Sequence, residues 1–401
     1  MPALNLPPSH FRVLIAGGCY SGLAAAIKLQ ELCDTIESSI SVDIVIVDEK
    51  DGFYHVIGSP LALSSKQYAE KAWVQYKDVK VLQRPNVTFV QGSLTHVDCE
   101  NKVATISLGK TQKRRVETYD FFVAGTGLRR AWPVVPQALS RDEYLAEAEA
   151  HITKVINSTA PVLVVGGGAV GIEMAAELKL VQPNVPVTLA HSRDKLLSAE
   201  PLPDMVKECA FELVEESGVD VLLNHRLASS TAVTASDGSQ VYNVEFTNGH
   251  RMVASEVIVA ISKSVPTSTY LPQDALDEEG YVNVRPTLQM PTCIPNADSH
   301  FAVGDLIHWS GIKRCGGAMH QGKLSGINMH QIMLQQVKGK APVFETLDEI
   351  PPMIGLAVGK NGLTYGSDGM KSGPQVMQVF FENDLGFRIV WDYLRLGGIT
   401  A

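Results

Sequence analysis

The chain has 401 residues, 45% of them hydrophobic and 19% charged, and a formal net charge of −9 at pH 7. Its length exceeds the roughly 250–300 residues at which a single hydrophobic core stops growing, so more than one domain is expected. The composition excludes a disordered or fibrous chain. The acidic balance argues against nucleic acid as a partner, because counterion release needs a positive face.

The spacing of the cysteines and the sequence of residues 1–11 indicate the cellular compartment of the protein. The six cysteines are widely spaced, with no C-x-x-C pair or metal-ligand cluster, so we expect reduced thiols and no metal site. No apolar stretch approaches the roughly 18–20 residues of a membrane span, residues 1–11 lack a signal-peptide layout, and Pro2 does not fit N-myristoylation. We therefore expect a cytoplasmic protein, with any membrane contact being peripheral.

Two segments share the order apolar strand, glycine-rich turn, Ala-rich helix, apolar strand. The first runs from Arg12 to Asp48 and the second from Val162 to His191. Their strands are continuously apolar, which is typical of parallel strands buried on both faces. Each segment therefore predicts a βαβ unit of the nucleotide-binding type.

The second turn, Gly166-Gly-Gly168-Ala-Val-Gly171, matches G-x-G-x-x-G between a strand and a helix. Its glycines allow a tight turn and a close approach of the pyrophosphate to the helix N-terminus. His191 and Arg193 stand where NAD enzymes carry an acid, which favours NADPH over NADH, although both could simply be a solvated strand end. The NAD(P)H-binding residues expected here are Gly166, Gly168, Ala169, Val170, Gly171, His191 and Arg193.

The first turn, Gly17-Gly-Cys19-Tyr-Ser-Gly22, has Cys19 where the second glycine is expected. A Cβ there would narrow the approach of a pyrophosphate. Asp48 ends the next strand, where an acid would bind a ribose. We expect a nucleotide here rather than a bare structural turn, and we interpret Cys19 as a small residue filling the turn rather than a reactive thiol.

Two further strand ends complete the pattern. Residues 301–305, Phe-Ala-Val-Gly-Asp, place an aspartate at the carboxyl edge of a parallel sheet, where it could bind a ribityl or ribose hydroxyl. Residues 123–127, Val-Ala-Gly-Thr-Gly, form a strand and turn that would bring the chain past the first nucleotide.

With these four segments in this order, the chain resembles the FAD-dependent pyridine nucleotide-disulfide oxidoreductases, in particular their apoptosis-inducing-factor-like branch. The likeness also covers 47–55, 68–73 and 358–361. It implies an α/β fold with two Rossmann-like, three-layer (β/β/α) nucleotide-binding domains and a small C-terminal α+β cap.

The resemblance also implies a division of the chain. The FAD-binding domain would be split between 1–130 and 263–340, the NAD(P)H-binding domain would occupy 131–262, and the cap 341–401. Glu173 would point toward the nicotinamide end. The FAD-binding residues expected are Gly17, Gly18, Cys19, Tyr20, Ser21, Gly22, Asp48, Glu49, Lys50, Thr126, Gly127, Gly304 and Asp305.

The function implied is hydride transfer from NADPH or NADH through FAD to a small acceptor, quinone-like or aromatic. Glu173 would orient the nicotinamide with Lys50 as its candidate partner, and His320 could supply a proton to the reduced acceptor. The plainer interpretations are a surface lysine and a helix-start histidine. The cysteine pair of the disulfide reductases is absent, so that reaction is not expected.

Departures from the family pattern leave alternatives open. The family turn Ala-Thr-Gly is Gly125-Thr-Gly127 here, and its second copy reads Ala260-Ile-Ser262. One alternative is a tailoring enzyme of secondary metabolism that uses FAD, with or without net redox change. Another is a signalling protein of the apoptosis-inducing type with little turnover. The cap could contact a membrane or form a homodimer.

Overall fold

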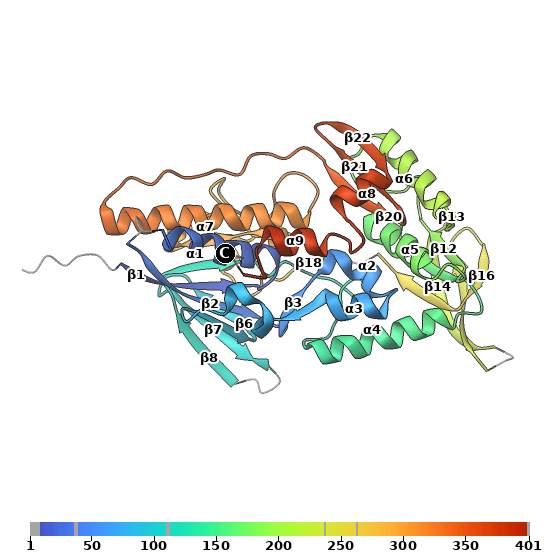
Figure 1. Ribbon diagram of the computed structural model, residues 1–401, viewed down its shortest axis with the longest axis horizontal. Coiled ribbons are helices and arrows are strands. Elements are labelled where there is room, and N and C mark those ends of the chain that lie inside the picture. The colour runs from blue at the N-terminus through green and yellow to red at the C-terminus, as the bar shows by residue number, and fades with distance from the viewer. Residues whose placement is uncertain (1–8, 36–38, 110–112, 236–237, 262–263, 399–401) are drawn as a thin grey trace, which may run out of the picture.

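The computed structural model describes residues 9–35, 39–109, 113–235, 238–261 and 264–398. Ser262, which belongs to one of the departures noted above, lies outside these ranges. The molecule is an α/β protein with two parallel sheets and a small cap, so the expected fold class is confirmed (Figure 1).

The first parallel sheet is built from the first βαβ unit and from strands that follow it much later in the chain. Its order is β19 (His300–Ala302), β9 (Phe121–Ala124), β1 (His10–Ala16), β2 (Ser41–Asp48) and β5 (Val87–Gln91). On one side lie α1 (Tyr20–Cys33) and α7 (Cys315–Lys338), and on the other an antiparallel sheet of β6 (Ser93–Asp98), β7 (Val103–Leu108) and β8 (Lys113–Thr118) (Figure 1).

Glycines let α1 and α7 approach closely. A Cβ at Gly322 would lie 2.1 Å from the carbonyl oxygen of Ser21, and one at Gly326 would lie 3.0 Å from that of Ala25. The alanine-rich sequence of α1 supplies the matching small side chains. Helix α7 is the next α-helix after β19, and this packing holds its start near the carboxyl edge of the sheet.

The second sheet repeats the plan. Its parallel order is β13 (Asp220–Leu222), β12 (Val187–Ala190), β11 (Val162–Val165) and β17 (Glu256–Val259). The accompanying elements are α4 (Arg141–Ile156), α5 (Ala169–Val181), α6 (Asp204–Glu216) and the meander β14 (Leu227–Thr234), β15 (Gln240–Phe246), β16 (Arg251–Ala254). The chain crosses between the two sheets at β10 (Leu128–Arg129) and β18 (Val265–Pro266), which pair antiparallel.

The remaining elements connect the sheets to the cap. Residues 52–75 form β3 (Gly52–Tyr54), α2 (Ser59–Ala62), α3 (Lys66–Ala72) and β4 (Trp73–Gln75). The cap consists of the antiparallel strands β20 (Ile354–Val358), β21 (Asn361–Gly366) and β22 (Gly369–Gly373), followed by α8 (Pro374–Phe380) and α9 (Phe387–Tyr393).

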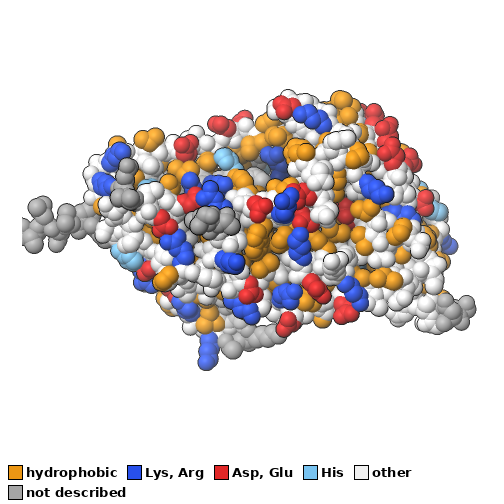
Figure 2. All heavy atoms as spheres, viewed as in Figure 1, with side chains coloured by type: hydrophobic (Ala, Val, Ile, Leu, Met, Phe, Trp, Pro, Cys, Tyr) orange, Lys and Arg blue, Asp and Glu red, His pale blue; other side chains and the backbone are white. Residues whose placement is uncertain are grey.

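The cap contacts both sheet units. Strand β20 packs on α5 of the second unit. Helix α9 returns to the first unit, where Trp391 meets Phe53 edge to face at 6.3 Å and the Lys323 ammonium of α7 lies 3.5 Å from the Tyr393 ring. On the face shown in Figure 2, acidic and basic side chains are interspersed without a continuous basic area. Among the residues placed by the structure, no helix is both long and apolar enough to cross a membrane.

Candidate functional site

A cavity of about 620 Å³ lies at the carboxyl edge of the first sheet. Its walls come from the first glycine turn, the ends of β2 and β3, the two interdomain crossings and the start of α7. Most residues expected to bind FAD line it, namely Gly17, Cys19, Tyr20, Ser21, Asp48, Glu49, Lys50, Thr126, Gly127 and Asp305.

Gly17, which lines the cavity, and Gly22, which does not, are both fixed by the geometry of the turn. Gly17 has a φ of +99°, and a Cβ there would lie 2.3 Å from the carbonyl oxygen of Gly125. A Cβ at Gly22 would lie 1.8 Å from the carbonyl oxygen of Gly17. These approaches exclude any side chain, so the two glycines are required by the turn itself.

Asp48 fastens this turn through its carboxylate. One oxygen accepts the Gly18 N–H at 2.7 Å and the other accepts the Lys50 N–H at 2.8 Å. The Tyr76 hydroxyl donates to the Gly18 carbonyl at 2.7 Å, a contact that the sequence did not reveal. Burial raises the pKa of Asp48, although both N–H bonds favour the carboxylate. Asp48 therefore shapes the cavity wall as well as facing the cavity.

Cys19 occupies the N-cap of α1 at the cavity wall. Its thiol points to the carbonyl oxygen of Tyr54, with the sulfur at 3.5 Å. Burial raises the pKa of Cys19 to about 12, so the group is a neutral thiol at physiological pH. This geometry favours the interpretation of Cys19 as a small residue filling the turn.

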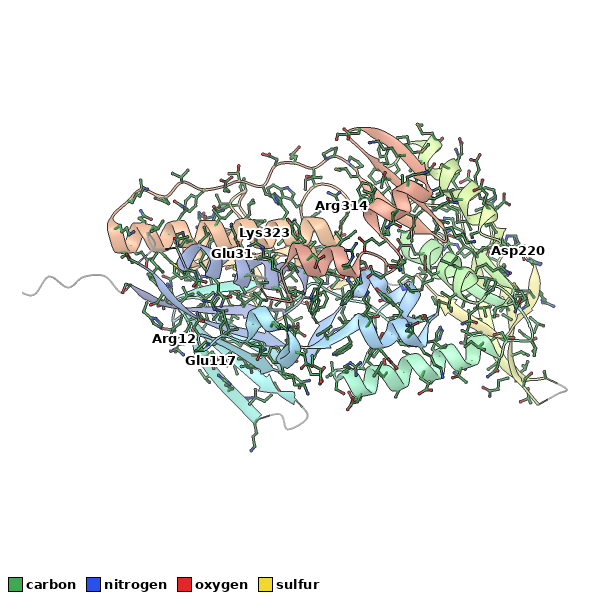
Figure 3. The ribbon with its side chains drawn as sticks, in the orientation of Figure 1. Arg12, Glu31, Glu117, Asp220, Arg314 and Lys323 are labelled. Carbon is green, nitrogen blue, oxygen red and sulfur yellow. The ribbon has the colours of Figure 1, made fainter. Side chains whose placement is uncertain are left out.

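The far end of the cavity is formed around Asp305 and the start of α7. Gly304, with φ +77°, donates its N–H to the Gln321 side chain at 2.7 Å and so fixes the turn before Asp305. The Asp305 carboxylate lies 3.3 Å from the Arg130 guanidinium. Arg314 precedes α7 and also lines the cavity (Figure 3).

Hydroxyl and carboxylate groups nearer the crossings are engaged within the protein. The Thr126 hydroxyl lies 3.0 Å from both the Thr267 carbonyl and the Tyr270 hydroxyl. Glu49 accepts two hydrogen bonds from Arg129, at 2.7 and 2.9 Å. These bonds link the segment around β10 to the residues that follow β18 and to the residue that follows β2.

The residues present fit a flavin adenine dinucleotide. The cavity runs from Asp48, past the first glycine turn, to Asp305 and the start of α7. In this turn, neighbouring backbone carbonyl oxygens leave no room for a Cβ at Gly17 or Gly22. Backbone N–H groups at the starts of α1 and α7 can face an anion or a polar ring edge. An elongated ligand with a pyrophosphate in its middle matches this arrangement.

The second glycine turn reproduces the first. Gly166 has a φ of +122°, and a Cβ at Gly171 would lie 1.8 Å from the carbonyl oxygen of Gly166. Around Gly168, where the first turn has Cys19, a Cβ would meet nothing within 4 Å. Ala169 and Val170 begin α5 directly after this open position. The second turn is therefore open to a close ligand approach.

His191 has another role than the expected phosphate contact. Its Nδ1 accepts the Gly167 N–H at 3.1 Å, and its Nε2 lies 2.8 Å from the Ser198 hydroxyl. Burial and the nearby Arg193 lower the pKa of His191, so the ring is neutral. The exposed Arg193 donates to the Ser198 carbonyl at 3.1 Å and leaves the rest of its guanidinium open.

Glu173 and Lys50 form no ion pair in the parts of the chain that the structure places. Glu173 accepts the Ala357 N–H of β20 at 3.1 Å. The Lys50 ammonium lies 3.5 Å from the Ala138 carbonyl and 5.8 Å from the Trp73 ring. The expected pairing is therefore corrected, because each side chain is directed to a different neighbour.

The structure also corrects the placement of His320. It is exposed on α7 and is absent from the cavity wall, which Cys315 and Ala318 of the same helix line instead. Residues two apart on a helix point to different sides, so His320 faces outward when Ala318 faces inward.

Sequence reasoning missed a buried histidine behind the cavity. His55 lies with Nδ1 3.3 Å from the hydroxyl of the cavity-lining Tyr20, and with Nε2 3.0 Å from the Leu385 carbonyl of the cap. Burial lowers its pKa to about 4, so the ring is neutral. His55 thus ties the cavity wall to the cap. No local pattern in the sequence indicates this, because Leu385 is distant in the chain.

Comparisons with known proteins agree with this geometry. A model of the pyridine nucleotide-disulphide oxidoreductase family matches residues 11–322. The chain is 46% identical to oxidoreductase OXR1 of Ajellomyces capsulatus, over 96% of this chain and 88% of that protein. It is 28% identical to ferroptosis suppressor protein 1 of Mus musculus, over 73% of each.

Solved structures share the fold. One is an engineered water-forming NADPH oxidase bound to NADPH, a variant of the NADH oxidase of Lactobacillus brevis. It has a TM-score of 0.65 and 15% identity, and the match covers 88% of this chain and 75% of that one. The resemblance inferred from the motifs is confirmed.

Proposed function

This chain belongs to the pyridine nucleotide-disulphide oxidoreductase family, whose members are NAD(P)H-dependent flavin enzymes, and we propose that it carries reducing equivalents from NADPH through FAD to a quinone-like organic acceptor. When bound, FAD supplies a ring that takes up two electrons from a nicotinamide and passes them on. The observation that carries this proposal is the repeated glycine turn. A Cβ at Gly22 or at Gly171 would lie 1.8 Å from a backbone carbonyl oxygen of the same turn, so both positions admit only glycine.

The first turn and its surroundings would hold the FAD. Gly17 to Gly22 would face the pyrophosphate, Asp48 the adenosine ribose, and Asp305 the ribityl chain. The bonds of Asp48 to the Gly18 and Lys50 N–H groups keep its carboxylate fixed at the wall. Tyr20 would be held in place by His55, which links it to the cap.

The second turn would hold the coenzyme, with NADPH preferred. The residue that follows β12 is His191, which is neutral, and not a carboxylate. Arg193 is exposed two residues later, with a guanidinium suited to a 2′-phosphate. In the structurally similar NADPH-bound oxidase, the substitutions include aspartate to alanine followed directly by alanine to arginine. Those two substitutions remove an acid and add an arginine next to it. This chain likewise has no acid directly after β12 and has Arg193 close by.

The groups around the proposed FAD site support an organic acceptor better than a disulfide. Tyr20, Tyr54 and Tyr76 contribute aromatic side chains to its wall. The cysteines placed by the structure are free thiols, and the two that line the cavity, Cys19 and Cys315, have pKa values raised by burial to about 12 and 11. Neither is activated for thiol exchange.

The cap is where membrane contact or a homodimer interface is expected, and both stay predictions. Helix α8 exposes Val379 and Phe380, and α9 exposes Ile389 and Tyr393.

Steady-state oxidation of NADPH tests the acceptor class. We expect a soluble short-chain quinone to speed NADPH consumption well above the rate with oxygen alone, and an oxidised dithiol to leave it unchanged. Turnover with the dithiol but not with the quinone would contradict the proposed acceptor.

A further inference from the structure

His55 stands between the wall of the cavity and the cap. It is 0% exposed and directly follows β3. Its Nδ1 lies 3.3 Å from the Tyr20 hydroxyl oxygen, and its Nε2 lies 3.0 Å from the Leu385 carbonyl oxygen. Tyr20 lines the cavity, whereas Leu385 belongs to the loop between α8 and α9 of the cap (Figure 1). One buried side chain therefore contacts both parts of the molecule.

The two partners determine which ring nitrogen carries the hydrogen. A carbonyl oxygen can only accept, so Nε2 of His55 is the nitrogen that donates to Leu385. Burial lowers the pKa of His55 to about 4, so the ring is neutral and Nδ1 is an acceptor. The Tyr20 hydroxyl then donates to Nδ1, and it accepts the Ile57 N–H at 3.3 Å. This hydroxyl is engaged within the protein, and Tyr20 offers the cavity its ring and backbone.

The cap side of this contact is held by a buried ion pair and a left-handed residue. Leu385 is 2% exposed and has a φ of +50°, which is unfavourable for a leucine. Its neighbour Asp384 is 4% exposed and lies 2.6 Å from the Lys71 ammonium. The carbonyl of Asp384 also accepts the Tyr68 hydroxyl at 2.7 Å. A strained residue held by such contacts indicates that the fold specifies the direction of the Leu385 carbonyl.

Gly58 leaves the room that this arrangement needs. A Cβ at Gly58 would lie 2.6 Å from Cδ2 of His55 and 2.3 Å from the Tyr68 hydroxyl oxygen. Any side chain there would push both rings away from their contacts with the cap. On the cap, the Phe387 ring meets His55 edge to face at 5.4 Å, and the Lys71 ammonium lies 5.0 Å from its centroid. The position of His55 is therefore set from both sides.

The same contacts define one wall of the proposed FAD site. Tyr20 and Ile57 both line the cavity, and Tyr20 is the first residue of α1. The preceding residue, Cys19, meets the Tyr54 carbonyl oxygen with its sulfur at 3.5 Å, so two contacts join the start of α1 to the segment that carries His55. Without His55, the buried Tyr20 hydroxyl would lose its acceptor, and the ring would have to turn to find another. The wall would then change shape.

We propose that His55 is a positioning residue of the FAD site, through which the cap fixes the cavity wall formed by Tyr20 and Ile57. FAD is held tightly while the Leu385 carbonyl, the His55 ring and the Tyr20 hydroxyl stay joined. The proposal rests on the proposed binding of FAD at the first turn. It adds the cap to that site, although none of the cap residues that the structure describes lines the cavity.

A suppressor variant tests the contact between His55 and Tyr20. In His55→Leu the buried hydroxyl has no acceptor, and we expect the rate of FAD release from the holoprotein to rise by about 10-fold. Tyr20→Phe/His55→Leu removes that hydroxyl as well and should bring the rate to within about 3-fold of the parent. Flavin fluorescence after dilution measures release. If the double variant releases FAD as fast as His55→Leu, the histidine acts through packing alone and the proposal is overturned.

Asp384→Ala tests the link to the cap at a residue that does not line the cavity. Loss of the ion pair with Lys71 frees the loop that carries Leu385, so FAD release should rise by about 5-fold. Asn383→Ala changes an exposed residue of the same loop, and this matched control should keep the parent rate. A parent rate in Asp384→Ala would overturn the role of the cap.

The visible circular dichroism of bound FAD reads the wall without depending on turnover. The flavin bands should change in His55→Leu and return to the parent form in the double variant. If His55→Leu does not fold, His55→Gln replaces it, because the amide still donates to Leu385 but places no acceptor at the position of Nδ1. Parent bands and a parent release rate in His55→Gln would overturn the proposal. A parent protein that takes up no FAD would instead contradict the proposed function.

Discussion

The imidazole Nδ1 of His191 accepts the backbone N–H of Gly167 at 3.1 Å. In the first unit, the Asp48 carboxylate accepts the N–H of Gly18, the corresponding residue of the other turn, at 2.7 Å. Each glycine turn is therefore held by a side chain at the end of the second strand of its βαβ unit. Asp48 is the last residue of β2, and His191 follows β12. An acid and a neutral imidazole perform the same structural task, and only the acid carries a charge into its site.

His191→Ala should therefore loosen the second turn without changing coenzyme preference. A hydrogen bond to a buried backbone N–H is lost, and we expect the free energy of unfolding to fall by about 1–3 kcal/mol. The affinities for NADPH and NADH should weaken by similar factors. Calorimetric titration with both coenzymes measures this, with His308→Ala at an exposed site as the control. A selective loss of NADPH would instead make His191 a phosphate ligand.

Arg193→Ala should reduce the preference for NADPH over NADH. A hydrogen bond to a charged group contributes about 1.5–3 kcal/mol, so the NADPH dissociation constant should rise by about 10- to 100-fold, while that for NADH should stay near its original value. The ratio of the two constants is the informative quantity. If it does not change, the 2′-phosphate is bound elsewhere.

Cys19→Gly should improve FAD retention, because it removes the only Cβ at the expected second-glycine position of the first turn. Gly17→Ala should do the reverse and also destabilise the fold, since its φ of +99° and the 2.3 Å approach to Gly125 exclude a side chain. The FAD-to-protein ratio after gel filtration measures both effects. Weaker retention in Cys19→Gly would show that the thiol itself supports the site.

Thiol labelling should follow exposure. Cys293 is exposed, whereas Cys19 lies in the cavity wall with a pKa raised by burial to about 12. A maleimide at pH 7.5 should therefore modify Cys293 first and leave Cys19 until the protein unfolds. Mass spectrometry of peptides from a time course measures this order. Early modification of Cys19 would revive its interpretation as a reactive thiol.

Stability should fall as pH rises through the range set by Glu177. Its pKa is raised by burial from 4.5 to about 8, so between these values the folded state holds a proton that the unfolded chain has lost. Each such group lowers the free energy of unfolding by up to about 1.4 kcal/mol per pH unit in this window. Glu177→Gln should therefore gain stability over the parent as pH rises from 5 to 8. Denaturant unfolding at both pH values tests this, and a constant difference would contradict it.

Features encoded by local pattern could be predicted from the sequence. The glycines at positions 17, 22, 166 and 171 are set by backbone approaches within a single turn, so spacing alone indicates them. The two parallel sheets follow from the repeated apolar strands. Family membership follows from the order of these segments.

Features that depend on distant contacts could not be predicted in this way. Position after a strand predicts ligand contacts for His191 and Lys50, but in the structure their side chains contact Ser198 and Ala138. The outward direction of His320 depends on which face of α7 packs on α1. The link from His55 to Leu385 joins residues that no sequence window contains together.

An anaerobic absorbance titration tests the central claim most directly. The purified protein should show the two visible bands of an oxidised flavin, and stoichiometric NADPH should bleach them, with colour returning on addition of a quinone. A colourless protein that takes up no FAD, or a yellow one that NADPH does not bleach, would contradict the account.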